Sequence, residues 1–154
     1  MVLKNIPLSF VLILLFVSAC DSTKKTENNY VRYVNPLIGT DFTGNTYPGA
    51  QVPFGMVQLS PDNGLPGWDR IAGYFYPDST IAGFSHTHLS GTGAGDLYDV
   101  SFMPVTLPYR EAPQPLGIYS SFSHDDESVS AGYYQVLLKD YGIHVELTAT
   151  ERCG

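Results

Sequence analysis

The stretch YYQVLLKDYGIHVELTATE, residues 133–151, decides the fold class of this chain. In residues 142–151 apolar and polar side chains alternate, and a period of two places the two sets on opposite faces of a β-strand. Residues 133–139 form a second β-prone run, and the three residues DYG at 140–142 supply a short connection. We therefore expect an antiparallel hairpin over residues 133–151.

Short β-prone segments also fill the region upstream of this hairpin, separated by Gly, Pro, Asn and Asp. They are VRYVNPLIG, GMVQLS, AGYFYP, TIAGFSH, LYDVSFMPV and GIYSSFSH. No connection between them has the length and pattern of a crossover helix, so the sequence predicts an all-β chain folded as an antiparallel β-sandwich. Residues 40–70 are rich in Gly and Pro, which indicates long ordered loops at one end of the sheets, a usual place for a binding site.

The amino terminus has the pattern of an export signal. Residues 8–19, LSFVLILLFVSA, are apolar but shorter than the roughly 20 residues that cross a bilayer. The run ends in VSAC, which resembles a bacterial lipoprotein signal with Cys20 as the acylated residue; an ordinary cleaved signal is the alternative. We expect a helical lipoprotein signal peptide at 1–19, a flexible tether at 20–29 and one domain at 30–154, anchored at the membrane in the periplasm or at the cell surface.

Charge and cysteine content narrow the classes of partner. The formal net charge is −7, from 15 acidic and 8 basic residues, which argues against nucleic acid but does not oppose neutral sugars. The two cysteines, Cys20 and Cys153, provide no disulfide framework.

The carboxyl-terminal residues LTATERCG keep a strand rhythm up to the last position. A strand ending there would leave a sheet edge unprotected, so we expect the chain to be a truncated piece. A compact natural domain that ends at this point is the alternative.

Several long runs together resemble a known enzyme family. They are YVNPLIGTD at 33–41, YPGAQVPFGMVQLSPD at 47–62, GWDR at 67–70, residues 72–104, GYYQVLL at 132–138 and ELTATER at 146–152. In this order they resemble the amino-terminal domain of glycoside hydrolase family 92, the bacterial exo-acting α-mannosidases. The resemblance covers nearly everything after the tether.

The resemblance implies a two-domain inverting enzyme that hydrolyses terminal mannose of glycans. Its amino-terminal half is a galactose mutarotase-like supersandwich, incomplete here, packed on a larger helical domain with a calcium-dependent active site between them. The acid and base carboxylates and the Ca²⁺ ligands come chiefly from the helical domain, which is absent. No catalytic residue and no metal ligand is therefore expected within these 154 residues.

Trp68 is the only tryptophan and stands in the loop sequence GWDR. An indole offers a flat apolar surface for the C–H face of a sugar ring and one N–H donor for a hydroxyl. By resemblance Trp68 lines the mannose subsite, and Asp69 beside it is a further substrate-binding candidate. The alternative is that Trp68 packs beneath its own loop as part of the core.

The stretch SHTHLSGTG, residues 85–93, allows three interpretations. If it is extended, His86 and His88 share a face and could bind a transition metal, but zinc needs three or four ligands, and Asp96 and Asp99 lie at spacings without firm precedent. The family's calcium prefers oxygen ligands. A second interpretation makes His86 and His88 part of a loop that meets sugar hydroxyls or the partner domain, and a third makes the stretch a plain turn.

The remaining charged residues give weaker signals. The run HDDE at 124–127 is most simply a solvated loop. Arg70 and Arg152 could hold carboxylates of the partner domain, or form ordinary surface ion pairs.

The sequence therefore predicts the amino-terminal, cleft-forming domain of an exported, calcium-dependent α-mannosidase, inactive by itself. One alternative function is a non-catalytic, carbohydrate-binding surface lipoprotein. Another is a small metal-dependent hydrolase centred on His86 and His88.

Overall fold

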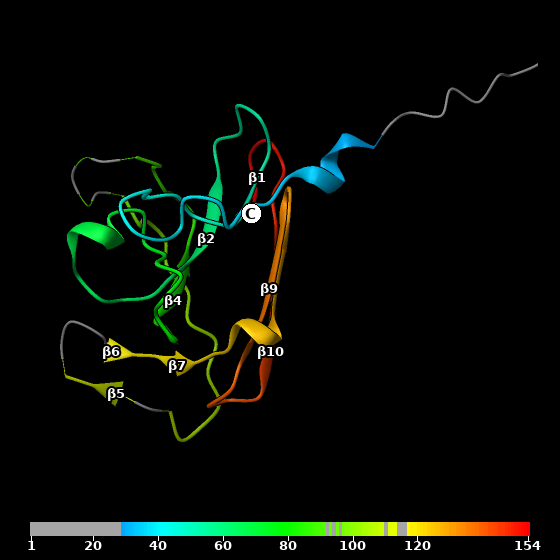
Figure 1. The fold of residues 1–154 in the computed structure, drawn as a ribbon. Helices are drawn as coiled ribbons and strands as arrows, with labels where there is room; N and C mark the ends of the chain where they lie inside the picture. The colour runs from blue at the N-terminus through cyan, green and yellow to red at the C-terminus, as the bar shows by residue number, and fades with distance from the viewer. Residues whose placement is uncertain (1–28, 92, 94, 96, 110, 114–116) are drawn as a thin grey trace, which may run out of the picture.

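The computed structural model of the chain describes residues 29–91, 93, 95, 97–109, 111–113 and 117–154 (Figure 1). The predicted signal peptide, Cys20 and nearly all of the predicted tether lie outside these residues, as does Asp96. The described part contains strands and three short 3₁₀ turns but no α-helix, so the all-β prediction is confirmed. None of its helical turns has the length and apolar character needed to span a bilayer. The turns are η1 (Tyr30–Tyr33), η2 (Trp68–Arg70) and η3 (His124–Asp126).

The predicted hairpin is confirmed as two strands of a three-stranded antiparallel sheet. Its strands, in the spatial order β10-β9-β8, are β8 (Glu127–Ser130), β9 (Tyr133–Leu138) and β10 (Ile143–Thr148). Ile143 pairs with Leu138 and Thr148 with Tyr133, which fixes the register. The strand ends three residues before the predicted end, because the Thr150 N–H donates to the Cys153 carbonyl at 2.7 Å and turns the chain.

A second antiparallel sheet has the order β1-β2-β4. Its strands are β1 (Ala50–Gln51), β2 (Gln58–Asp62) and β4 (Gly83–Ser85). Two small pairs complete the described structure: β3 (Thr80–Ile81) with β7 (Ser120–Ser121), and β5 (Glu111–Ala112) with β6 (Gly117–Ile118). Figure 1 shows the β9–β10 hairpin alongside the β1-β2-β4 sheet, with β5, β6 and β7 gathered at one end.

The hydrophobic core lies between the two three-stranded sheets, which gives the molecule its two layers. Leu59 and Phe84 from one sheet and Val136 and Leu147 from the other belong to a single buried cluster. Alternation along β9 explains this placement, because Tyr134, Val136 and Leu138 are buried whereas Gln135 between them is exposed. Burial of these side chains supplies most of the driving force for folding.

Three upstream segments that were predicted as strands differ in the structure. Residues 30–33 form η1, residues 97–105 contribute only an isolated bridge from Phe102 to Phe84, and AGYFYP at 72–77 forms turns. In AGYFYP the backbone makes scattered bonds instead of a ladder: the Phe75 N–H donates to Asn63 Oδ1 at 2.5 Å, the Asn63 N–H donates to the Gly73 carbonyl and the Tyr76 N–H to the Thr40 carbonyl. Aromatic composition favoured a strand there, but the local hydrogen bonds of Asn63 decide otherwise.

Candidate functional site

A cavity of about 600 Å³ opens beside η2, between residues 62–73, residues 82–83 and the more distant Gly93, Gly95, Tyr98 and Ser101. Its wall contains the indole of Trp68, the aliphatic side chains of Leu65 and Ile71, and two charged residues, Asp62 and Arg70. A concave, largely apolar surface with a few polar groups is the usual form of a small-molecule site. The loops at 40–70 were predicted to carry such a site, and this cavity lies against their carboxyl-terminal part.

Trp68 begins the η2 turn and exposes 63% of its surface. This exposure rules out the alternative in which the ring packs beneath its loop as a core residue. Asp69 follows it in the same turn and is partly buried. Its neighbours Trp68 and Arg70 line the cavity, but Asp69 is not among the described residues that do so. The structure therefore leaves the indole free to meet a ligand.

The η2 turn is held from its carboxyl end by an ion pair. Arg70 Nε donates to Asp78 Oδ2 at 2.6 Å, and Arg70 Nη2 donates to Asp78 Oδ1 at 2.5 Å. These bonds raise the pKa of the Arg70 guanidinium, which also lies 4.5 Å from the centroid of the Phe75 ring. Arg70 thus pairs with a carboxylate of its own chain, which agrees with the predicted alternative of an ordinary ion pair and not with a carboxylate of a partner domain. Arg152 is exposed and has no ion pair with a described residue.

His88 is buried, with only 1% of its surface exposed. Its Nδ1 lies 2.7 Å from the Gln58 carbonyl, which can only accept, so this nitrogen carries a hydrogen. Its Nε2 lies 2.9 Å from Asp62 Oδ1 and 3.2 Å from Ser85 Oγ. His88 therefore reaches the cavity through the Asp62 carboxylate, not through its own ring.

His86 has different surroundings from His88. Its Nδ1 lies 2.8 Å from the Val100 carbonyl, its ring contacts Phe102 edge-on, and it lines a second cavity of about 470 Å³. Within the part of the chain that the structure describes, no group of three or more His, Cys, Asp or Glu residues could hold a metal ion. The described residues thus do not fit a calcium site.

Residues 124–127 are not a solvated loop, and that prediction is wrong for two of the four side chains. The Glu127 carboxylate is only 2% exposed and accepts hydrogen bonds from the Tyr74 hydroxyl at 2.9 Å and the Tyr134 hydroxyl at 2.7 Å. His124 Nδ1 lies 2.6 Å from its other oxygen. The missed signal is the alternation ESVS in β8, which places Glu127 on the inward face with Val129.

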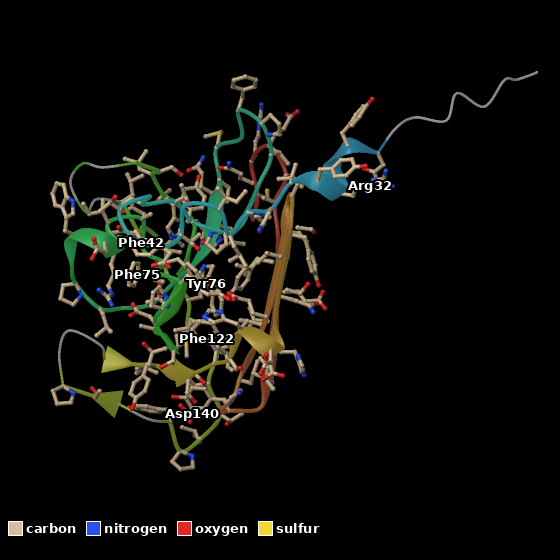
Figure 2. The ribbon with its side chains drawn as sticks, viewed as in Figure 1. Arg32, Phe42, Phe75, Tyr76, Phe122 and Asp140 are labelled. Carbon is tan, nitrogen blue, oxygen red and sulfur yellow. The ribbon has the colours of Figure 1, made fainter. Side chains whose placement is uncertain are left out.

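The Glu127 cluster, meaning Glu127 with Tyr74, Tyr134 and His124, joins the loop that follows η2 to the β8-β9-β10 sheet. Burial, reinforced by the Glu127 charge, raises the pKa of both tyrosines well above the ordinary 10.0, so both remain hydrogen-bond donors. His124 also stacks on Tyr76 at 3.9 Å. Figure 2 shows Tyr76 and Phe122 near η3, on the side facing the loops.

Comparison with known proteins gives a consistent result. Residues 33–154 match the glycosyl hydrolase family 92 N-terminal domain. An uncharacterized secreted glycosidase of Arthroderma benhamiae is 32% identical over 138 residues, which are 83% of this chain and 17% of that protein.

Solved structures agree with the sequence match. A family GH92 alpha-mannosidase from Bacteroides thetaiotaomicron, solved in complex with mannoimidazole, has 47% identity and a TM-score of 0.73 over 79% of this chain and 17% of its own. A GH92 inverting mannosidase of the same organism has 32% identity and a TM-score of 0.60 over 79% of this chain and 16% of its own.

The two-layered fold is thus that of a glycoside hydrolase domain. The chain spans about a sixth of the length of these relatives, 17% for the secreted glycosidase. It belongs to glycosyl hydrolase family 92, and the match at residues 33–154 is to the amino-terminal domain of that family.

Proposed function

We propose that this chain is the amino-terminal part of an exported, calcium-dependent α-mannosidase that releases terminal mannose from glycans with inversion. Its contribution is one wall of the sugar-binding cleft. The observation that carries the proposal is the exposed indole of Trp68 on a cavity of about 600 Å³, in a domain of a family whose solved members include mannosidases. A flat indole beside polar groups suits a sugar ring, which has both C–H faces and hydroxyls.

The proton-transfer groups of this enzyme are expected outside the chain. Inverting hydrolysis needs an acid and a base whose carboxyl groups are about 6.5–9.5 Å apart with room for a water molecule. The most buried carboxylates here are occupied: Asp78 binds Arg70, and Glu127 binds two tyrosines. We assign both catalytic carboxylates and the Ca²⁺ ligands to a carboxyl-terminal helical domain, and expect this chain alone to be inactive.

The other predicted site residues keep supporting roles in the proposal. Asp69 adds a carboxylate next to the stacking indole, and His86 offers a partly exposed imidazole at the second cavity. Acylation of Cys20 and the tether at 20–29 would hold the enzyme at the membrane, where glycans of the periplasm or the exterior reach it. The secreted relative supports export.

The alternative, a carbohydrate-binding lipoprotein without catalysis, is favoured by the same exposed indole. The two functions differ in what the 154-residue chain does by itself. Under the alternative the isolated chain binds mannosides without calcium, and calorimetry would detect this. Under the enzyme proposal binding needs the remainder of the cleft.

Replacement of Trp68 by alanine in the full-length protein tests the proposal. We expect kcat/KM for α-mannosides to fall about tenfold or more while the melting temperature stays nearly unchanged, because the ring is exposed and contributes little to the core. Tyr109→Ala, an exposed aromatic residue outside the cavity, is the matched control. Wild-type turnover in Trp68→Ala would remove the site, and a full-length protein without α-mannosidase activity would remove the function.

A further inference from the structure

The polar wall of the Trp68 cavity contains a carboxylate that sequence reasoning did not single out. Asp62 is the last residue of β2 and lines the cavity together with Trp68. Its side chain is 15% exposed, and its Oδ1 lies 2.9 Å from the buried Nε2 of His88. Among the residues that the structure describes, none donates a hydrogen bond to its Oδ2, and Asp62 is one of the residues of the cavity wall.

His88 holds this carboxylate in one orientation. Its Nδ1–H donates to the Gln58 carbonyl, and its ring packs 5.1 Å from the centroid of Tyr47 and edge-on against Tyr98. With Nδ1 bound to a carbonyl, Nε2 can point only at Asp62 and Ser85. A buried imidazole fixed in this way is a typical second partner for a carboxylate that must keep one position.

Close packing prevents Asp62 from turning away. A Cβ built on Gly73 would overlap Asp62 Oδ1 and lie 3.2 Å from His88 Cδ2, and Gly73 has φ +87°, which favours glycine in any case. The chain thus passes directly behind the contact between Asp62 and His88. The carboxylate is thus packed on its Oδ1 side, while Asp62 also lines the cavity.

The chemistry of this wall suits a hydroxyl donor. An ionised carboxylate only accepts hydrogen bonds, and bonds to it from hydroxyls are shorter and stronger than bonds between neutral groups. Arg70, the cation on the same wall, is bound on two nitrogens by Asp78, so it is already paired and is not bound to Asp62. A neutral sugar stacked on Trp68 would bring hydroxyl donors to an acceptor that has already lost part of its solvation.

We propose that Asp62, oriented by His88, determines specificity in the Trp68 cavity, with its Oδ2 accepting a hydrogen bond from one hydroxyl of a neutral hexopyranoside. This inference rests on the proposed function and names the group that reads the sugar. Trp68 supplies an apolar surface that any pyranose can cover, whereas a fixed acceptor distinguishes sugars by where a hydroxyl lies.

The experiment combines one substitution with a set of ligands. Wild-type full-length protein and its Asp62→Asn variant are assayed with methyl α-mannoside as an inhibitor, and with its monodeoxy analogues, one lacking each hydroxyl. We expect the wild type to bind one analogue about tenfold or more weakly than the parent sugar. Asp62→Asn should bind the parent with a similar loss and no longer discriminate against that analogue.

The design separates this inference from the proposed function. If Asp62→Asn discriminates among the analogues as the wild type does, Asp62 is only a structural partner of His88 and the inference is wrong. If the wild type neither binds nor cleaves mannosides, the function itself fails. Asp125→Asn, an exposed carboxylate on η3, is the matched control.

A second variant covers the case in which Asp62→Asn does not fold. His88→Gln keeps the carboxylate but replaces the rigid imidazole that contacts it. We expect it to lose several-fold of the discrimination against the same analogue with less effect on the others. Unchanged discrimination in His88→Gln would overturn the role of His88 in positioning Asp62.

Discussion

The β8-β9-β10 sheet and the loop of residues 62–78 are held together by different kinds of interaction. In the sheet, six consecutive residue pairs join β9 to β10, and alternate side chains are buried. The loop has scattered turn bonds in place of a ladder, supplemented by single polar side chains: Asn63 Nδ2 donates to the Thr80 carbonyl at 2.7 Å, and Arg70 binds Asp78. Many equivalent interactions support the sheet, whereas each polar side-chain contact of the loop supports its segment without an equivalent beside it.

This difference places stability and recognition in separate regions. Removing a core side chain from the sheet should lower the free energy of unfolding of the whole domain. Removing a polar contact from the loop should disturb the position of Trp68 more than it disturbs the fold. The Glu127 cluster lies where the two regions meet, so its substitution should have an intermediate effect.

The largest effect is expected for Leu138→Ala in β9, because Leu138 is fully buried in the core cluster. Loss of its side chain should lower the free energy of unfolding by about 2–5 kcal/mol through lost burial and the cavity left behind. Gln135→Ala, exposed on the other face of the same strand, is the control and should change it by less than about 0.5 kcal/mol. Urea denaturation would measure both, and equal effects would contradict the two-layer core.

An intermediate effect is expected for Tyr74→Phe, which removes one of the hydroxyls bound to Glu127. The buried carboxylate then lacks a donor, which should cost about 1–3 kcal/mol at neutral pH. Tyr109→Phe, an exposed tyrosine, is the matched control. An unchanged free energy of unfolding in Tyr74→Phe would mean that the cluster does not link the loop to the sheet.

The same tyrosine makes the free energy of unfolding fall as pH rises in the alkaline range. The pKa of Tyr74 and that of Tyr134 are raised above 10.0 in the folded state, mainly by burial. Their contribution is therefore complete below pH 10 and is lost as pH rises further, because the unfolded chain releases protons that the folded chain retains. Tyr74→Phe should make this decline shallower by about one proton, which denaturation at several alkaline pH values would detect.

The sequence predicted the sheet well because its information there is repetitive. Alternation over residues 133–151 predicts the strands, their buried face and their pairing as a hairpin, and one residue that departs from the pattern does not change this prediction. The loop carries no such repetition. The run AGYFYP has strand composition, but its Phe75 N–H donates to the side chain of Asn63, a residue twelve positions away whose role no periodic pattern indicates.

The site was predictable only in part, for the same reason. The exposed Trp68 followed from a lone indole in a Gly-rich loop and from the family resemblance. Asp62, by contrast, ends a strand in the ordinary sequence QLSPD, and its partner His88 is 26 residues further along the chain. Only the fold brings the carboxylate and the imidazole together. The solvated-loop prediction for Glu127 failed likewise, because its tyrosine partners lie on two other segments.

The smallest effect on stability, and the sharpest contrast with Leu138→Ala, is expected for Asp78→Asn in the loop. The amide keeps the shape but weakens the bonds to Arg70, whose side chain is 23% exposed and can be solvated by water, so the cost should be about 1 kcal/mol. Trp68 lies in the same 3₁₀ turn as Arg70 and is the only tryptophan of the 154 residues, so its fluorescence anisotropy reports directly on that turn. We expect Asp78→Asn to lower the anisotropy, because the indole moves faster. Asp125→Asn should leave the anisotropy unchanged. Unchanged anisotropy would mean that the η2 turn is rigid without the ion pair, and that the loop, like the sheet, has redundant support.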